Sequence, residues 1–182
     1  MEITGKRVIL REARMRDRMM LQDLVQDPDI VKVTGGYGSA APRARWKGGF
    51  RPFLVPDTSG ILRRVIADRE APEKGLGIVM LTHMDAGDGT AEIYIKLAAS
   101  ARGRGYGRDA VDALVFHAFQ KLGLQQIRSS VLEHNIASRK LFEACGFWQE
   151  NAHKGSADRD GQCRMVCSYV ITKDAMTDGD DK

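Results

Sequence analysis

The chain has 182 residues, of which 43% are hydrophobic and 29% charged, and its net charge is +4. This length and balance suit one compact globular domain and exclude a fibrous or largely disordered chain. No apolar run approaches the ~20 residues of a membrane-spanning helix, and the amino terminus lacks the apolar stretch of a signal peptide. We therefore expect a cytoplasmic protein with no membrane partner, a single domain over residues 1–175 and an acidic, disordered tail over 176–182.

Neither the cysteines nor the charge clusters define a site by themselves. Cys145, Cys163 and Cys167 are an odd number in a chain without an export signal, so no disulfide framework is expected. They also lack the partners of a zinc site, and no metal is predicted. Basic residues gather in segments 43–51 and 102–108. Such clusters suit a polyphosphate ligand, plain solubility or, as the weakest interpretation, nucleic acid.

The first half of the chain predicts an antiparallel arrangement. Alternation from Arg7 to Arg14 predicts a strand, and the spacing in MRDRMMLQDLVQ predicts a helix ending near Pro28. Residues 34–56, rich in glycine and proline, predict an irregular loop. Three further strands are predicted, with the turn-rich DAGDGT making a hairpin of the last two: 62–67, 77–82 and 91–97.

The second half changes to alternating strands and helices. From Asp109 to Leu122 apolar residues recur every three or four positions, as in a helix packed on a sheet, and Gly123 ends it. A shorter helix is predicted over 136–145, where Gly146 suits a left-handed cap. Strands are predicted over 127–132 and 164–171. The order is an antiparallel front half followed by β-α-β-α-β, which indicates a mixed α/β (α+β) fold.

The segment LAASARGRGYGRDA, residues 97–110, lies between a predicted strand and the longest predicted helix. Its alternating glycines let the backbone curl closely around a ligand. A helix start offers up to four N–H groups without an intrahelical partner and a partial positive charge, which together favour a phosphate. The loop therefore predicts an anion site, although glycines also suit a plain strand-to-helix turn. The residues that matter here are Gly103, Gly105 and Gly107 with the flanking Arg102, Arg104 and Arg108.

A dinucleotide-binding fold is a competing interpretation of the same loop. Residues 105–110, GYGRDA, fit G-x-G-x-x-A, and Glu133 ends the next strand, where such folds place a ribose-binding acid. However, only one further helix and one strand are predicted after Glu133, too few for a doubly wound sheet. The strand before the loop also alternates apolar and polar residues, unlike a central parallel strand. An NAD-binding protein is therefore kept as an alternative.

Two blocks together resemble the GCN5-related N-acetyltransferase (GNAT) superfamily. Arg102-x-x-Gly105-x-Gly107, opening a helix, resembles its acetyl-CoA signature, and residues 131–147, VLEHNIASRKLFEACGF, resemble its other cofactor motif. With the opening RVILREAR the chain is most similar to the branch of ribosomal-protein N-terminal acetyltransferases and their small-molecule relatives. The resemblance spans Arg7 to about Ile171, except for residues 34–56. It implies a mostly antiparallel sheet of six to seven strands, splayed at a cofactor cleft and flanked by about four helices.

The resemblance also implies an activity. An acetyl group would pass from acetyl-CoA to a primary amine, either a protein N-terminal α-amine or a small-molecule amine, by direct attack in a ternary complex. A catalytically silent acyl-CoA-binding module is the alternative within the same fold. Implied partners are acetyl-CoA and the amine acceptor, and because dimers are common among such relatives a homodimer is a further expectation.

By the same resemblance, the strand ending at Leu97 splays from its parallel neighbour and binds pantetheine along its free edge. The amides of Gly103 to Arg108 would bind the pyrophosphate, and a strand N–H would stabilise the oxyanion. Asn135 would contact pantetheine besides capping its helix. The expected cofactor-binding residues are Ile95, Leu97, Arg102, Gly103, Arg104, Gly105, Tyr106, Gly107, Arg108, Asn135, Ser138 and Phe142.

Phe142 departs from the family pattern, because many members carry Tyr there as the acid that protonates the departing thiolate. Ser138 would supply that proton instead, although a polar residue in a first helical turn needs no such role. A thiol with a pKa of ~8.5 also leaves as thiolate with little help.

A base must remove a proton from the acceptor amine. Glu92, on the strand leading into the cleft, is the first candidate, before Glu133, Asp68 and His83. Tyr37 and Trp46 are expected to shape the acceptor pocket together with the arginines of segment 34–56. The basic character of that segment argues against a polycationic acceptor.

Overall fold

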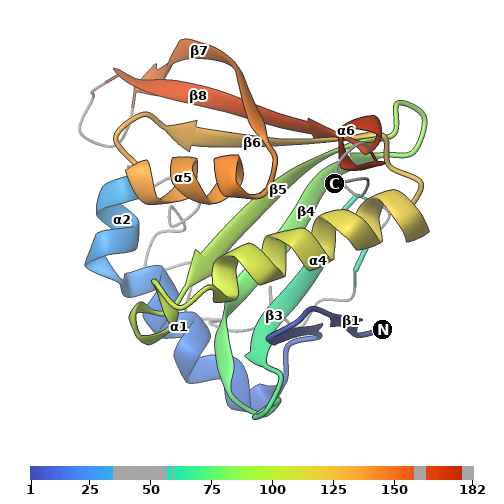
Figure 1. The fold of residues 1–182 in the computed structure, drawn as a ribbon. Helices are drawn as coiled ribbons and strands as arrows, with labels where there is room; N and C mark the ends of the chain where they lie inside the picture. Colours follow the sequence, from blue (N-terminus) through green and yellow to red (C-terminus); the bar gives the residue numbers. More distant parts are fainter. Residues whose placement is uncertain (35–56, 59, 158–162, 178–182) are drawn as a thin grey trace.

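The computed structural model describes residues 1–34, 57–58, 60–157 and 163–177, and within them eight strands form one sheet (Figure 1). Their order across the sheet is β1-β2-β3-β4-β5-β6-β8-β7. Every neighbouring pair is antiparallel except β5 and β6, which run parallel. The bounds are β1 Ile3–Thr4, β2 Val8–Arg11, β3 Leu62–Asp68, β4 Gly75–Asp85, β5 Thr90–Leu97, β6 Gln126–Leu132, β7 Trp148–Ala157 and β8 Cys163–Thr172. The predicted mixed, mostly antiparallel sheet is confirmed, with eight strands in place of the expected six to seven.

Helices cover both faces of the sheet (Figure 1). The long α4 (Tyr106–Lys121) and the shorter α5 (Ile136–Ala144) lie on one face, while α1 (Arg18–Gln26) and α2 (Pro28–Thr34) lie on the other. A short α6 (Lys173–Thr177) follows β8, and the 3-10 turns η1 (Met15–Asp17) and η3 (Ala99–Ala101) precede α1 and α4. The sheet therefore has an α4 face and an α1 face.

The main core lies between the sheet and the α4 face. The apolar stripe of α4 is fully buried at Ala110, Val111 and Leu114, and Ile93 of β5 and Ile127 of β6 lie in the same cluster. Gly123 ends this helix with a left-handed φ of 73°. A smaller cluster on the α1 face contains Leu21, Leu24, Ile30 and Ile78. β4 is therefore buried on both faces, whereas the buried residues of β5 lie on the α4 face.

A buried ion pair fixes α1 against the sheet. The guanidinium of Arg11 on β2 donates to both carboxylate oxygens of Asp17 at 2.8 Å, and both side chains are 1% exposed. Arg11 also donates to the carbonyl of Pro72, and Asp17 accepts the backbone N–H of Arg14. Because each partner fills the other's hydrogen-bonding sites, the pair tolerates burial that would otherwise be costly.

Four elements escape the sequence prediction. The predicted helix ends near Pro28 as expected, at Gln26, but Pro28 then begins a second helix, α2, which was not predicted. At this first helical position the missing N–H of proline costs nothing, and Asp27 Oδ1 accepts the N–H groups of Asp29 and Ile30. β1 has only two residues, and the predicted strand from Arg7 shrinks to β2. β7 is an edge strand of polar sequence, WQENAHKGSA, so it lacks the alternation that signals a strand.

The fourth is α6, which carries helix into the segment expected to be tail. Met176 packs against the main core, and residues 178–182 lie outside the described part. Segment 35–56 also lies outside it, so the expected irregular loop, Tyr37 and Trp46 are not described. Across the described ranges, no helix has the length and apolarity needed to traverse a bilayer.

Replacing Asp17 with Asn should destabilise the protein strongly. The substitution leaves the buried guanidinium of Arg11 without its counter-charge, and breaking such a pair costs about 3–5 kcal/mol. Urea unfolding measures the change in free energy. The matched control is Glu2→Gln, because the Arg14–Glu2 pair is exposed and weak, worth about 1 kcal/mol or less. Equal effects of the two substitutions would contradict the role of the Arg11–Asp17 pair.

Candidate active site

The two parallel strands at the centre of the sheet diverge. β5 and β6 are paired only at Thr90, Ala91 and Glu92, although β5 continues to Leu97 and β6 to Leu132. Just beyond the last pair, the hydroxyl of Ser129 donates to the carbonyl of Ile93 at 3.2 Å. Backbone pairing therefore ends at Glu92 and a V-shaped opening begins beyond the Ser129–Ile93 contact, as the family resemblance implied.

The edge of β5 beyond this point offers backbone groups to the opening. Ala98 donates its N–H to Leu76 on β4 at 2.8 Å, so the polar groups of Leu97, which alternate with it, point away from β4. By the same alternation those of Ile95 face the opening, where pairing with β6 does not reach. Arg102 Nε donates to the carbonyl of Leu97 at 3.1 Å. The N–H of Leu97 and both polar groups of Ile95 are left for an extended ligand.

The glycine loop has the backbone of an anion cradle. Gly103 and Gly105 have left-handed φ values of 70° and 82°, and a Cβ built on either would project into open space. Gly105 is the N-cap of α4 and its carbonyl accepts the N–H of Asp109. Within the described residues, no hydrogen-bond acceptor is found for the amides of residues 103–108. These amides, at the positive end of a 16-residue helix, are free to bind phosphate.

One carboxylate fixes the position of this helix start. Asp109 accepts the backbone N–H groups of Lys6, Arg7 and Val8 at 2.9, 2.6 and 3.0 Å. These donors belong to the turn between β1 and β2, about a hundred residues away in sequence. The clamp holds the first turn of α4 against the sheet.

The arginines of the loop have different surroundings. Arg102 pairs with Asp27 and, at 3.4 Å, with Asp29, so it ties the loop to the start of α2. Burial works to raise the pKa of Asp27, but hydrogen bonds from the Ile30 N–H and from Arg102 bring it below its usual value. The guanidinium of Arg102, expected to contact the cofactor, is thus already neutralised. Arg104 and Arg108 are exposed beside the cradle.

Tyr106 does not point its side chain at the cradle. Its hydroxyl donates to Asp68 at 2.8 Å, and the guanidinium of Arg104 lies 5.5 Å from its ring centre. Hydrogen bonds from the Glu70 N–H and from Tyr106 lower the pKa of Asp68, so this carboxylate is a poor base. Tyr106 can reach a ligand only through its amide, and Asp68 serves as its acceptor.

The second motif opens α5 at the other side of the cleft. Asn135 caps the helix, since its side-chain oxygen accepts the Ser138 N–H at 3.2 Å, which confirms the predicted N-cap. Ser138 is half-buried, and no partner for its hydroxyl is found in the described part of the chain. Gly146 takes the predicted left-handed conformation, with a φ of 84°. The contacts of Asn135 and Ser138 with a cofactor stay predictions.

Phe142 is a core residue. It is 2% exposed, meets Phe147 edge-on with ring centres 5.1 Å apart and stacks on Tyr169 at 6.4 Å. The hydroxyl of Tyr169 in turn donates to Glu143 and accepts from Arg139. The packing of this ring in the core accounts for a phenylalanine at position 142, and no contact with the cofactor is needed to explain it.

The α1 face of β5 carries the candidate base. Glu92 is 22% exposed at the point where the strands part, and its carboxylate lies 3.4 Å from Nδ1 of His83. His83 has a left-handed φ of 49° at an irregularity in β4, a strained conformation that often marks functional sites. The structure thus brings two of the four candidate bases together. Asp68 lies elsewhere, and Glu133 is exposed after β6.

Two neighbours of Glu92 were missed from the sequence. Tyr94 and Lys96 follow it on the same face of β5, as the period of two along a strand requires. Burial and the carboxylate of Glu92 raise the pKa of Tyr94 above its usual value. Burial alone lowers the pKa of Lys96. The alternation in AEIYIKL is a signal from which both could have been found.

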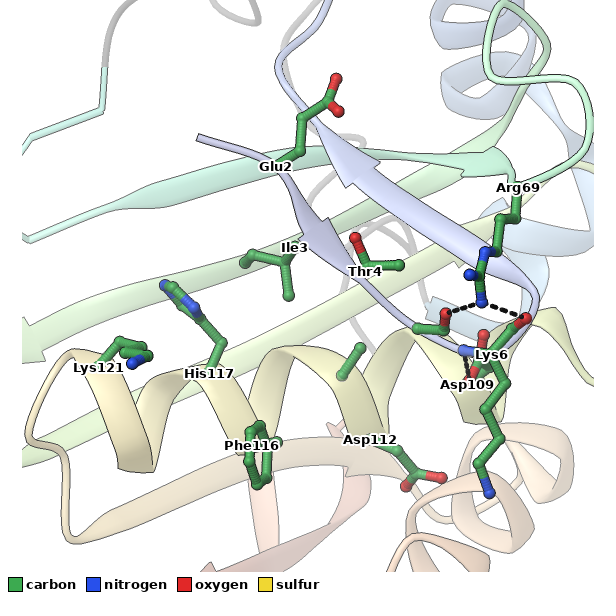
Figure 2. A pocket seen from close by; sticks show the side chains of 12 residues that line it. Glu2, Ile3, Thr4, Lys6, Arg69, Asp109, Asp112, Phe116, His117 and Lys121 are labelled. Atoms are coloured by element: carbon green, nitrogen blue, oxygen red, sulfur yellow. Dashed lines mark hydrogen bonds between the residues drawn. The ribbon is translucent and has the colours of Figure 1, made fainter.

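A separate groove runs between β1 and α4 (Figure 2). Its volume is about 620 Å³, and its lining includes Thr4, Asp112 and the exposed ring of Phe116. It lies on the flank of α4 away from α5 and is not the opening between β5 and β6. The described residues contain no cluster of side chains suited to hold a metal ion.

The acetyltransferase (GNAT) domain family matches residues 7–148. The chain belongs to this family. It is therefore an acetyl-CoA-dependent N-acetyltransferase, and the free amides and unobstructed glycines of the cradle fit coenzyme A. The NAD-binding alternative is wrong, because the sheet has one parallel pair instead of a doubly wound parallel core.

Individual proteins resemble the chain at low identity over nearly its whole length, and the solved structures among them share its fold. An uncharacterized N-acetyltransferase p20 from Bacillus licheniformis is 23% identical over 171 residues, covering 92% of this chain and 94% of that protein. A spermidine N-acetyltransferase from Vibrio cholerae, solved with CoA and spermine, has a TM-score of 0.79 at 19% identity and covers 95% of this chain and 99% of its own. A GNAT-family acetyltransferase from Bacillus anthracis has a TM-score of 0.80 at 17% identity, with 96% and 99% covered.

Adding a methyl group at Gly105 should weaken coenzyme A binding by about tenfold or more, because the cradle must distort to relieve a left-handed Ala. Gly123→Ala is the matched control, since Gly123 has a φ of 73° and equally open space but lies beyond the other end of α4. Both variants should lose a similar amount of folding free energy. Calorimetric titration of coenzyme A measures the dissociation constant, which should rise for Gly105→Ala only. Equal dissociation constants for the two variants would refute the cradle.

Proposed function

We propose that the chain acetylates a primary amine by direct attack on acetyl-CoA held in the opening between β5 and β6. The observation that carries this proposal is the position of Glu92 at the last β5–β6 pair, on the face opposite the cradle. Acetyl-CoA would enter from the α4 face and the amine from the α1 face, so that they meet where the strands part.

Each chemical step has a candidate group. Glu92, directly or through water, would take a proton from the acceptor ammonium, since only the neutral amine attacks. A backbone N–H on the free edge of β5, such as that of Ile95, would stabilise the oxyanion. The thiolate would leave with little help or take a proton from Ser138, and Tyr94, which keeps its proton, is a second donor.

A covalent acetyl-enzyme has little support. Burial and the neighbouring carboxylate of Asp112 raise the pKa of Cys145, which makes its thiol a poor nucleophile. Cys167 is buried within the core, and Cys163 lies at the start of β8. Positioning amine and thioester together can instead supply about 7–11 kcal/mol of the barrier.

The acceptor is proposed at the level of a protein N-terminal α-amine or a small-molecule amine. The likeness of RVILREAR to ribosomal-protein N-terminal acetyltransferases supports the first, and the Vibrio cholerae neighbour solved with spermine supports the second. An α-amine, with a pKa of ~7.7–8.0, also loses its proton to a base more easily than an alkylamine with a pKa of ~10.4. A homodimer is a further proposal of the same kind.

Thiol release from acetyl-CoA, measured across a panel of peptides and small amines, tests this function. We expect amine-dependent release by the native chain. Glu92→Gln should lower kcat by about 10²-fold or more while leaving coenzyme A binding intact, because it removes the base alone. Glu73→Gln, at an exposed glutamate beyond β3, is the control with native activity. Tight acetyl-CoA binding without release by any amine would instead support the silent module.

A further inference from the structure

Two cations lie on the α1 face around the candidate base. Lys96 follows Glu92 and Tyr94 along β5, each two residues further. Across the sheet, Arg63 on β3 pairs in register with Met80 on β4, and Met80 with Tyr94, so these three side chains form one row. Neighbouring strands are about 4.8 Å apart, which places the row within roughly 10 Å. Together these residues form a floor on the α1 face, where Tyr94 is 37% exposed and Lys96 is half-buried.

Neither cation has a counter-charge in the described structure. Nη1 of Arg63 is buried and has no hydrogen-bond partner among the described residues. Lys96 is half-buried, and the described part of the chain provides no partner for its ammonium group. Burial lowers the pKa of Lys96, which reports the cost of keeping it charged there.

The two arginines that are fully buried in the described structure are, by contrast, neutralised. Arg11 has Asp17, and Arg64, 4% exposed, has Asp57 at 2.7 Å. Arg64 belongs to the same strand as Arg63 but faces α4, so the contrast between them follows the two faces of the sheet. Buried charges are normally paired, and an unpaired one requires an explanation. A negatively charged ligand supplies it.

Resting on the proposed transfer reaction, we propose that the acceptor carries a carboxylate a few bonds from its amine, and that Lys96 and Arg63 bind this carboxylate while Glu92 faces the amine. Successive residues on one face of a strand are about 7 Å apart. An amine held between Glu92 and Tyr94 and a carboxylate at Lys96 are therefore separated by several bonds. The floor holds one carboxylate and two cations, which is the complement of an amino acid and disfavours a polycation.

The test compares acceptors matched except for the carboxylate. Glycine, γ-aminobutyrate and 6-aminohexanoate are assayed against ethylamine, butylamine and hexylamine, with spermidine as the polycation. We expect kcat/KM for the best ω-amino acid to exceed that of its alkylamine by about tenfold or more, since a hydrogen bond to a charged group contributes that much. The dependence of kcat/KM on the length of the ω-amino acid reports the spacing between the base and the two cations.

Variants at position 96 identify the contact. Lys96→Met should lower kcat/KM for the ω-amino acid by about ten- to hundredfold and leave the alkylamine unchanged, whereas Lys96→Arg should retain the preference. Lys154→Met, at an exposed lysine on β7, is the control. Melting temperatures verify that each variant folds. Glutarate, with coenzyme A bound, should raise the melting temperature of the native chain and of Lys96→Arg but not of Lys96→Met.

The outcomes separate this inference from the proposed function. Transfer that favours spermidine, or a carboxylate preference that survives Lys96→Met, overturns the inference and leaves the acetyltransferase activity standing. Absence of transfer to every amine overturns the proposed function. If glutarate then still protects the native chain but not Lys96→Met, the anion site stands without the reaction, and if it protects neither, both fall.

Discussion

The early separation of β5 from β6 is the constraint on which the rest of the structure depends. Three paired residues hold the strands together, and beyond Glu92 they diverge. The separation turns an interior strand edge, normally satisfied by a neighbour, into a surface with unused N–H and C=O groups. An extended amide-containing molecule is the natural complement of such an edge, and pantetheine has that character.

The two faces of the sheet carry different parts of the proposed site. On the α4 face, Asp109 clamps the helix start to the β1–β2 turn and Gly105 curls the backbone, and the loop amides have no acceptor within the described residues. On the α1 face, the alternation of β5 places Glu92, Tyr94 and Lys96 side by side, where we propose that the acceptor binds. The buried Arg11–Asp17 pair and the Arg102–Asp27 contact hold α1 and α2 at the border between these regions. In the proposed function, the cofactor and the acceptor therefore bind on opposite sides of one gap.

The parts of the site made by backbone could be predicted from the sequence, because glycine spacing and helix starts have a direct conformational meaning. The cradle and the cap at Asn135 are of this kind. The roles of side chains were harder to predict from the sequence, since they depend on partners that are distant in the chain. Nothing near Arg102 in sequence indicates Asp27, and nothing near Phe142 indicates its packing on Tyr169. Polar edge strands such as β7 are also missed from the sequence, because a strand that is largely solvent-exposed need not alternate apolar and polar residues.

The central claim is that the main-chain amides of residues 103–108 bind the diphosphate of coenzyme A. Titrating coenzyme A into ¹⁵N-labelled protein, with the glycine amide resonances assigned, tests it most directly. The account predicts that the amide signals of Gly103, Gly105 and Gly107 shift strongly in parallel with binding, while that of Gly123, beyond the far end of α4, stays in place. Binding of coenzyme A that leaves the three loop signals unmoved would contradict it.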